Sequence, residues 1–278
     1  MTAEQSLRFW DITTRPPAEK TCCAPNPWKA RLALNFKAVR YGTTWTPMTD
    51  ITRVRTSLAV PPVRKFADGS DFHTLPLLYD PATGDYVGDS FDIAVYLQKH
   101  YPNEGAGDLF PPQPTAALDF TVPPDAEILI PLTEARPGDF QDYAQFNVHV
   151  DAAFTLHVQL AMDGFPFDPA TEEASKAVFT GRAGVRAWED LLLTSEARVR
   201  TLASFERMLG GLAVLYRRDE SGPFLLGTRA CFADCIVGGW LRMMAATLPG
   251  NEWEALRSWH DGTFGRLHDA LDAFSAVK

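Results

Sequence analysis

The chain has 278 residues, of which 46 % are hydrophobic, a length and composition that predict two modest domains with packed cores. Its net charge of −9 is unevenly divided, because residues 1–100 carry 12 Lys/Arg and 10 Asp/Glu whereas residues 101–278 carry 14 and 25. This acidic balance argues against nucleic acid as a partner, since binding phosphates requires a basic surface.

Hydropathy and cysteine spacing exclude two further classes. Residues 1–8 lack the apolar core of a signal peptide, and no window approaches the roughly 18 uninterrupted apolar residues of a membrane helix. The cysteines form an adjacent pair, Cys22-Cys23, and a pair at helical spacing, Cys231 and Cys235, without the repeated Cys/His spacing of a zinc site. We therefore expect a cytoplasmic protein with reduced thiols, no membrane partner and no metal.

Short strands and helices alternate along the first hundred residues. Apolar residues recur at helical spacing over 28–39, and the other segments are β-rich or bounded by turn residues. The expected elements are a strand at 7–12, a helix at 28–39, a strand at 41–46, a helical or irregular segment up to Phe66, strands at 75–79 and 86–87, and a helix beginning at Asp89. This order predicts a thioredoxin-like α/β domain over residues 1–103.

The rest of the chain is predicted to be a linker followed by an all-helical domain. Residues 104–114 are rich in proline and glycine, as linkers are, and residues 115–278 form the second domain. Long helical patterns cover 141–162, 182–216 and 231–248. Four prolines make a continuous helix over 118–140 unfavourable, so this stretch is expected to be part helix and part loop.

Two motifs in the first domain predict a site for a small acidic peptide. Leu75-Pro76 opens a strand, where a cis peptide bond is tolerated and turns the Leu75 backbone outward. Asp89-Ser90 begins a helix, whose first turn offers unpaired N–H groups and a partial positive charge to a carboxylate. Taken separately, each motif is an ordinary structural feature, but together they predict a site that holds a small acidic peptide.

The architecture and several motifs resemble the soluble glutathione transferases, and in particular their fungal etherase-related (β-etherase-like) class. The residues that carry the resemblance are Pro25 to Lys37, Thr74-Leu75-Pro76 with Asp80-Pro81, Asp89 to Ala94, and Ser258 to Gly262 with Phe264-Gly265-Arg266. The resemblance implies that Ser90 binds the γ-glutamyl carboxylate of glutathione, that Asp89 lies nearer its ammonium group, and that the Leu75 backbone pairs with the cysteinyl unit. It also implies a homodimer.

One departure from the class concerns the chemistry of the thiol. Members of the class place a serine directly before the Pro-Asn of the first helix, where its hydroxyl steadies the glutathione thiolate, but this chain has Ala24. Asn26, whose amide can donate to a thiolate at any pH, and Cys23, whose thiol lies near a helix N-terminus, are the candidate replacements. Cys22 is a further possibility, and the adjacent cysteines can equally be small buried residues.

The remaining candidates concern the ends of the ligands. His73 lies three residues before the proline and is a candidate glutathione contact, although a lone histidine is more often structural. Candidates for the glycyl carboxylate are Lys37, Arg40, Arg55, Arg64 and Lys65, among which the sequence does not choose. The second substrate is expected in an apolar cleft between the domains, with walls from residues 13–26 and from Tyr143, His149, Phe154 and Trp240.

The resemblance predicts a glutathione transferase in which bound glutathione attacks a hydrophobic electrophile of aromatic or polyketide-like type. The reaction would be β-aryl ether cleavage or conjugation, in detoxification or secondary metabolism. Two alternatives remain open at this point. One is a glutathione-dependent isomerase of natural-product biosynthesis, and the other is a non-catalytic protein that binds glutathione or hydrophobic ligands.

Overall fold

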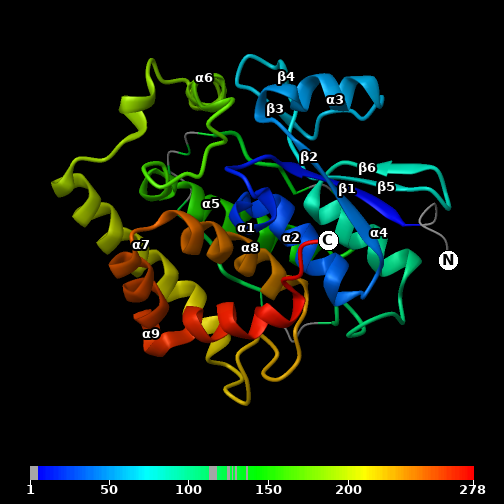
Figure 1. The fold of residues 1–278 in the computed structure, drawn as a ribbon. Coiled ribbons are helices and arrows are strands. Elements are labelled where there is room, and N and C mark those ends of the chain that lie inside the picture. Colours follow the sequence, from blue (N-terminus) through cyan, green and yellow to red (C-terminus); the bar gives the residue numbers. More distant parts are fainter. Residues whose placement is uncertain (1–5, 113–117, 124–125, 127, 129, 136) are drawn as a thin grey trace.

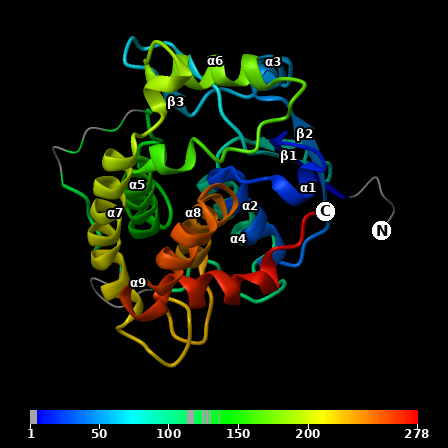
Figure 2. The same ribbon diagram turned by 60° about the vertical axis from the view of Figure 1, so that its left-hand side comes forward.

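The computed structural model describes residues 6–112, 118–123, 126, 128, 130–135 and 137–278, and Figures 1 and 2 show the fold. The strands are β1 (Leu7–Ile12), β2 (Tyr41–Thr46), β3 (Arg64–Lys65), β4 (Asp71–Phe72), β5 (Leu77–Asp80) and β6 (Asp85–Val87). The helices are α1 (Ala18–Thr21), α2 (Pro25–Phe36), α3 (Ile51–Ser57), α4 (Ser90–His100), α5 (Gln141–Thr155), α6 (Glu172–Ala183), α7 (Ser195–Tyr216), α8 (Phe232–Thr247) and α9 (Gly250–Ala270). No described helix is long and apolar enough to cross a bilayer.

The first domain has the predicted thioredoxin-like arrangement. Its main sheet has the order β2-β1-β5-β6, in which β1 runs parallel to β2 and antiparallel to β5. Helices α2 and α4 pack together on one face of this sheet, and α3 lies on the other side (Figure 1). The segment up to Phe66 was expected to be helical or irregular. At its end β3 pairs with β4 in a short hairpin, which periodicity in so short a stretch did not reveal.

Both predicted features of the peptide site are present in the backbone. The Leu75-Pro76 bond is cis, and a second cis bond joins Pro16 to Pro17. Helix α4 begins at Ser90 with Asp89 as its N-cap, because Asp89 Oδ1 accepts a hydrogen bond from the Phe91 N–H at 2.8 Å. Local capping chemistry therefore fixed this helix start as the sequence predicted.

The second domain is helical, but two predicted helix boundaries were wrong. Helix α5 ends at Thr155 and is followed by a short 3₁₀ turn at 158–161, so the pattern over 141–162 is not one helix. The pattern over 182–216 is also divided, because α6 ends before Gly184, whose φ of 67° suits glycine, and α7 begins after Thr194. The Thr194 hydroxyl caps α7 by accepting from the Ala197 N–H at 3.3 Å.

Helix α8 is the centre of the protein and joins the two domains. It is buried along most of its length and packs against α2, α5 and α9 (Figure 2). Its first turn is held by Asp234, which accepts the Cys231 N–H at 2.8 Å and the Leu225 N–H at 2.9 Å. Cys231 and Cys235 are fully buried, which indicates a structural role for both.

The described part of the predicted linker is packed against both domains. Leu109 and Phe110 are buried, and the Leu109 carbonyl accepts a hydrogen bond from the Phe232 N–H at 2.7 Å. Residues 113–117 lie outside the described residues, so the boundaries proposed at 103 and 115 stay predictions. The contacts around Leu109 nevertheless tie the start of α8 to the end of the first domain.

Candidate functional site

A cavity of about 130 Å³ lies between the two domains, at the N-terminus of α2. The first domain contributes the end of β1, the start of α2 and the connection from β4 to Leu75, and the second domain contributes parts of α5, α6 and α8. The lining residues used below are Ala24, Asn26, Arg64, Phe72, Leu75, Leu132, Asp151, Arg182 and Trp240. Most of the remaining wall is apolar, as in typical small-molecule sites.

The start of α2 presents one amide group to this cavity. Helix N-termini usually carry several free N–H groups, but Pro25 and Pro27 have none, and the Trp28 N–H is bonded to the Ala24 carbonyl at 3.1 Å. Asn26 is therefore the single backbone donor left in the first turn. Its side-chain Oδ1, which is an acceptor, is buried and has no partner in the described residues, so it is available to a ligand donor.

Leu75 offers the second unpaired group. It is 3 % exposed, yet within the described residues its backbone N–H and C=O have no hydrogen-bond partner, because the pairing of β5 with β1 begins only at Leu77. Buried backbone groups are nearly always paired, so an unpaired pair beside a cavity points to a peptide-like ligand. A bound peptide can form the missing backbone hydrogen bonds to Leu75 there.

Arg55 fixes the two halves of the peptide site relative to each other, and sequence reasoning missed this role. Its guanidinium is fully buried and donates to the carbonyls of Thr74 at 2.7 Å, Gly88 at 2.8 Å and Pro61 at 2.5 Å. Thr74 and Gly88 directly precede Leu75 and Asp89, so one side chain connects the two segments that were predicted to bind the peptide. Burial lowers the pKa of Arg55 to about 10, which leaves it charged at neutral pH.

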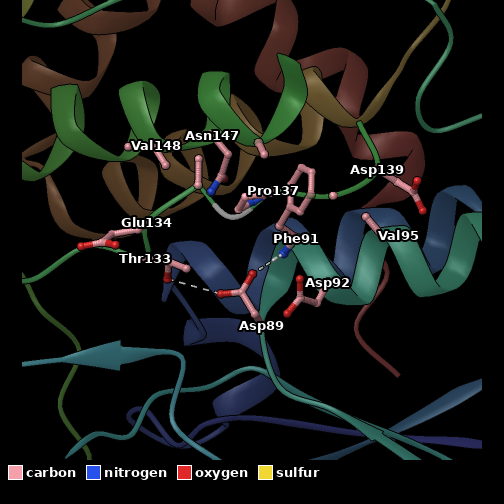
Figure 3. A pocket seen from close by; sticks show the side chains of 13 residues that line it. Asp89, Phe91, Asp92, Val95, Thr133, Glu134, Pro137, Asp139, Asn147 and Val148 are labelled. Carbon is pink, nitrogen blue, oxygen red and sulfur yellow. Dashed lines mark hydrogen bonds between the residues drawn. The ribbon is translucent and has the colours of Figure 1, made fainter. Parts of the chain in front are cut away.

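The start of α4 borders a second cavity of about 250 Å³, shown in Figure 3. It lies between α4, α5 and residues 133–135 and 137–139, and none of the described residues that line it is basic. Four of the lining side chains are carboxylates: Asp89, Asp92, Glu134 and Asp139. Ser90 is 2 % exposed and is not among the lining residues, although it begins the same helix. These four described carboxylates suit an ammonium group.

The segment over residues 130–134 crosses from one cavity to the other. The Thr133 hydroxyl donates to Asp89 Oδ2 at 3.4 Å, and Arg64 donates from Nε to Thr133 Oγ1 at 2.8 Å and from Nη1 to the Pro131 carbonyl at 3.2 Å. Nothing in the sequence around Thr133 indicated this contact. Because Leu132 also lines the first cavity, the segment contributes to its small volume.

A buried ion pair forms the floor of the first cavity. Lys29 of α2 donates to Asp151 of α5, and the indole N–H of Trp240 donates to the same carboxylate at 2.7 Å. Asn147 accepts a further hydrogen bond from Lys29 at 2.9 Å. Both domains therefore meet at one neutralised charge pair, which no local sequence pattern indicates because its members are more than 100 residues apart.

The structure distinguishes Asn26 from the two cysteine candidates. Cys23 is fully buried, does not line either cavity, and has its thiol pKa raised well above the usual value by burial. Cys22 is also buried, and its pKa is raised to about 12, chiefly by burial. A thiol in such surroundings is a poor nucleophile at neutral pH. Asn26 lines the cavity and Cys23 does not.

His73 and the glycyl-carboxylate candidates are also distinguished. The His73 side chain does not line either cavity, its Nδ1 is buried without a described partner, and burial lowers its pKa. Lys37 is buried and donates to the carbonyls of Pro102 and Gly107, and Lys65 is exposed and paired with Asp71. Among the five candidates, Arg64 alone lines the cavity.

Of the aromatic residues expected to form the walls, Trp240 lines the cavity. Phe154 lies behind it, with the two ring centroids 5.3 Å apart, and Tyr143 is buried and donates to the Pro111 carbonyl at 2.8 Å. His149 is not part of the lining either. Wall residues from α6, such as Phe179, were missed, because helical periodicity does not show which apolar residues face a cleft.

Comparison with known proteins identifies the family. Residues 24–100 match the glutathione S-transferase N-terminal domain, and residues 169–274 match the glutathione S-transferase C-terminal domain. Among curated proteins, the chain is 27 % identical to the "Glutathione S-transferase-like protein ustS" of Aspergillus flavus, over 85 % of this chain and 79 % of that protein.

Solved structures agree with the sequence matches. A glutathione S-transferase of Ceriporiopsis subvermispora, determined in complex with glutathione, is 25 % identical with a TM-score of 0.73, covering 98 % of this chain and 99 % of that chain. Glutathione transferase GSTFuA3 from Phanerochaete chrysosporium, at 24 % identity and a TM-score of 0.75, covers 98 % of each chain and has the same fold. The chain therefore belongs to the glutathione S-transferase family, with glutathione as its cosubstrate.

Proposed function

We propose that the protein is an etherase-like glutathione transferase whose bound thiolate attacks an aromatic or polyketide-like electrophile in the cavity between the domains. The observation that carries the proposal is the unpaired Leu75 backbone, which is buried beside this cavity. The conserved geometry of a strand edge allows a cysteinyl residue to form both missing hydrogen bonds there.

In this proposal, glutathione lies across both cavities. Its cysteinyl unit pairs with Leu75, its γ-glutamyl carboxylate binds at the N-terminus of α4 beside Ser90, and its ammonium group faces Asp89. The carboxylates around the second cavity support the placement of the ammonium group, because they attract it, and the γ-glutamyl carboxylate on the same carbon then faces the N–H groups at the start of α4. Residues 131–133, which contact both Arg64 and Asp89, must move or adapt when the peptide binds.

Asn26 is proposed to stabilise the thiolate. A thiolate at the start of α2 can accept from the Asn26 backbone N–H and from its side-chain amide, which takes the place of the hydroxyl that Ala24 lacks. Hydrogen bonds to the anion favour ionisation and lower the thiol pKa. The buried Cys23 thiol has no such route to the cavity.

The reaction is a substitution at carbon. The sulfur lone pair of glutathione forms a C–S bond, the bond from that carbon to the aryl ether oxygen breaks, and the aryloxide leaves and takes up a proton from solvent. The enzyme contributes proximity between the two substrates and a stabilised thiolate. The apolar lining around Trp240 and Phe72 supports an aromatic second substrate.

Calorimetry with reduced glutathione tests the site, and product analysis tests the reaction. We expect micromolar to millimolar binding to the wild type and weakened binding to Ser90→Ala. Aryl ethers and enones are then supplied with glutathione, and mass spectrometry follows the thioether product. Isomerised enone without consumption of glutathione would identify an isomerase, and the absence of both binding and product would refute the proposal.

We also propose a cytoplasmic homodimer, as the resemblance to this class implies. Multi-angle light scattering of the purified protein measures the mass directly, and a dimer of 30.8 kDa chains is expected. A monomer at micromolar concentration would refute this part alone, because the glutathione site described above is built from a single chain.

A further inference from the structure

Two guanidinium groups from different domains stand on one wall of the cavity between the domains. Arg64 belongs to β3, and Arg182 belongs to the last turn of α6. Both approach the ring of Phe72, with Cζ of Arg182 4.9 Å and Cζ of Arg64 6.0 Å from its centroid. Positive charge is therefore concentrated in a cavity whose lining is otherwise mostly apolar.

Arg182 is a cation without a counterion. Its guanidinium donates to the His73 carbonyl at 3.2 Å, and no ion pair found among the described residues includes it. Burial lowers its pKa to about 10, and the nearby positive charge of Arg64 acts in the same direction. Arg182 is still charged at neutral pH, so its desolvation is not offset by a carboxylate.

The fully buried cations of the described chain have either an ion-pair partner or at least two carbonyl acceptors, as Lys37 has, whereas Arg182 is partly buried and donates to one carbonyl. Lys29 is paired with Asp151, Arg31 is paired with Asp11 at 2.6 Å, and Arg55 donates to three carbonyls. Arg64 is partly satisfied by Pro131 and Thr133, which leaves Arg182 as the less satisfied member of the pair. A desolvated and incompletely satisfied guanidinium beside a cavity is arranged to receive an anion.

The lining does not supply that anion. Asp151 is the carboxylate among the described lining residues, and it is already bonded to Lys29 and to the indole of Trp240. Since no described lining residue supplies it, we take the anion that pairs with Arg182 to belong to a ligand. Around Arg182 the wall includes Phe72 and Phe179, so the ligand group next to the anion is best matched by an aromatic ring.

We propose that Arg182 binds a carboxylate on the electrophile, so that this enzyme selects aromatic acids over the corresponding neutral compounds. The inference rests on the proposed function, since it names the substrate class of the same cavity. The glycyl carboxylate of glutathione has the same chemistry and is the other possible source of the anion. Its assignment to Arg182 is the competing outcome of the test.

The test compares 4-(bromomethyl)benzoate with its methyl ester, which react with glutathione by the same displacement of bromide at the benzylic carbon. The wild type is expected to have the higher kcat/KM for the benzoate. Arg182→Met should lower kcat/KM for the benzoate by about 10- to 100-fold, the usual loss of a charge-assisted hydrogen bond, and should change that for the ester by less than about threefold. Arg182→Lys should retain part of the preference.

Two controls separate this outcome from general damage. Arg186→Met removes a charge four residues further along the chain, at a side chain that is 94 % exposed, and should leave both rates unchanged. Circular dichroism and thermal melting confirm that the variants are folded. Equal losses for the benzoate and the ester in folded Arg182→Met would overturn the proposal.

Calorimetry assigns the anion to its source and is independent of turnover. Wild type and Arg182→Met are titrated with glutathione, with γ-glutamylcysteine, which lacks the glycyl carboxylate, and with unreactive 4-methylbenzoate. Weaker binding of 4-methylbenzoate alone supports the proposal, even if no conjugation is detected. Weaker binding of glutathione but not of γ-glutamylcysteine assigns Arg182 to the glycyl carboxylate and overturns it. A wild type that binds no glutathione refutes the proposed function, but leaves the 4-methylbenzoate result valid.

Discussion

Replacing Asn26 should raise the pKa of the thiol of bound glutathione. Pro25 and Pro27 remove two of the N–H groups at the start of α2, so a thiolate there depends on the backbone and side chain of Asn26. Asn26→Ala removes the side-chain donor and keeps the backbone donor. The Asn26 side chain has no hydrogen bond to other described residues that its removal would break, so little change in stability is expected.

The expected shift follows from the strength of one hydrogen bond to an anion. Such a bond is worth about 1.5–3 kcal/mol, and about 1.4 kcal/mol corresponds to one pKa unit, so Asn26→Ala should raise the thiol pKa by about 1–2 units. Asn26→Asp should raise it further, because it also places a negative charge beside the thiolate. Because the thiol pKa is raised in both variants, the rise of kcat/KM with pH should move to higher pH in both.

Ultraviolet absorbance of the thiolate, titrated against pH for the enzyme saturated with glutathione, measures this pKa. Cys23→Ala is the matched control, since the buried Cys23 thiol has a raised pKa and should not ionise in the neutral range. Its titration curve should coincide with that of the wild type. An unchanged thiol pKa in Asn26→Ala, together with loss of the thiolate signal in Cys23→Ala, would refute the role of Asn26. It would instead favour Cys23 as the residue that acts at the thiol.

Three further predictions concern binding and stability. Ser90→Ala should weaken glutathione binding about tenfold in calorimetry without lowering the melting temperature, whereas Asp89→Ala should lower both, because loss of the N-cap costs about 1 kcal/mol. An unchanged Kd in Ser90→Ala would contradict the site. Lys29→Met should lower the free energy of unfolding by about 3–5 kcal/mol in urea titrations, because Asp151 is left buried and unpaired, and Lys29→Met/Asp151→Leu should recover part of the loss. Burial raises the folded-state pKa of Asp234 to about 6, above its unfolded value of 3.8. Between these pH values the native state binds the extra proton, so ionisation of this carboxyl makes the protein less stable by about 3 kcal/mol as pH rises from about 4 to 6. The difference in unfolding free energy between wild type and Asp234→Asn should follow this window, and parallel pH profiles would contradict it.

Local signals in the sequence determined the fold class and the peptide-binding motifs. Apolar spacing predicted β1, β2 and the start of α5, and the Asp89 cap was confirmed because it depends on neighbouring residues alone; the cis bond at Leu75-Pro76 is also present. The residues that match the family carried the identification of a glutathione transferase, which the comparisons confirmed. Helix ends were predicted less well, because helical periodicity continues across Gly184, whose left-handed conformation ends α6.

The tertiary structure alone decided which charged groups meet at the site. Arg55 was one of several equivalent cations in the sequence, but the fold buries it between the Thr74 and Gly88 carbonyls and makes it structural. Lys29 meets Asp151, and Arg64 approaches Arg182, across separations of more than 100 residues that no local pattern records. Burial then sets the chemistry of each group, since desolvation and the nearest partner determine its charge and availability.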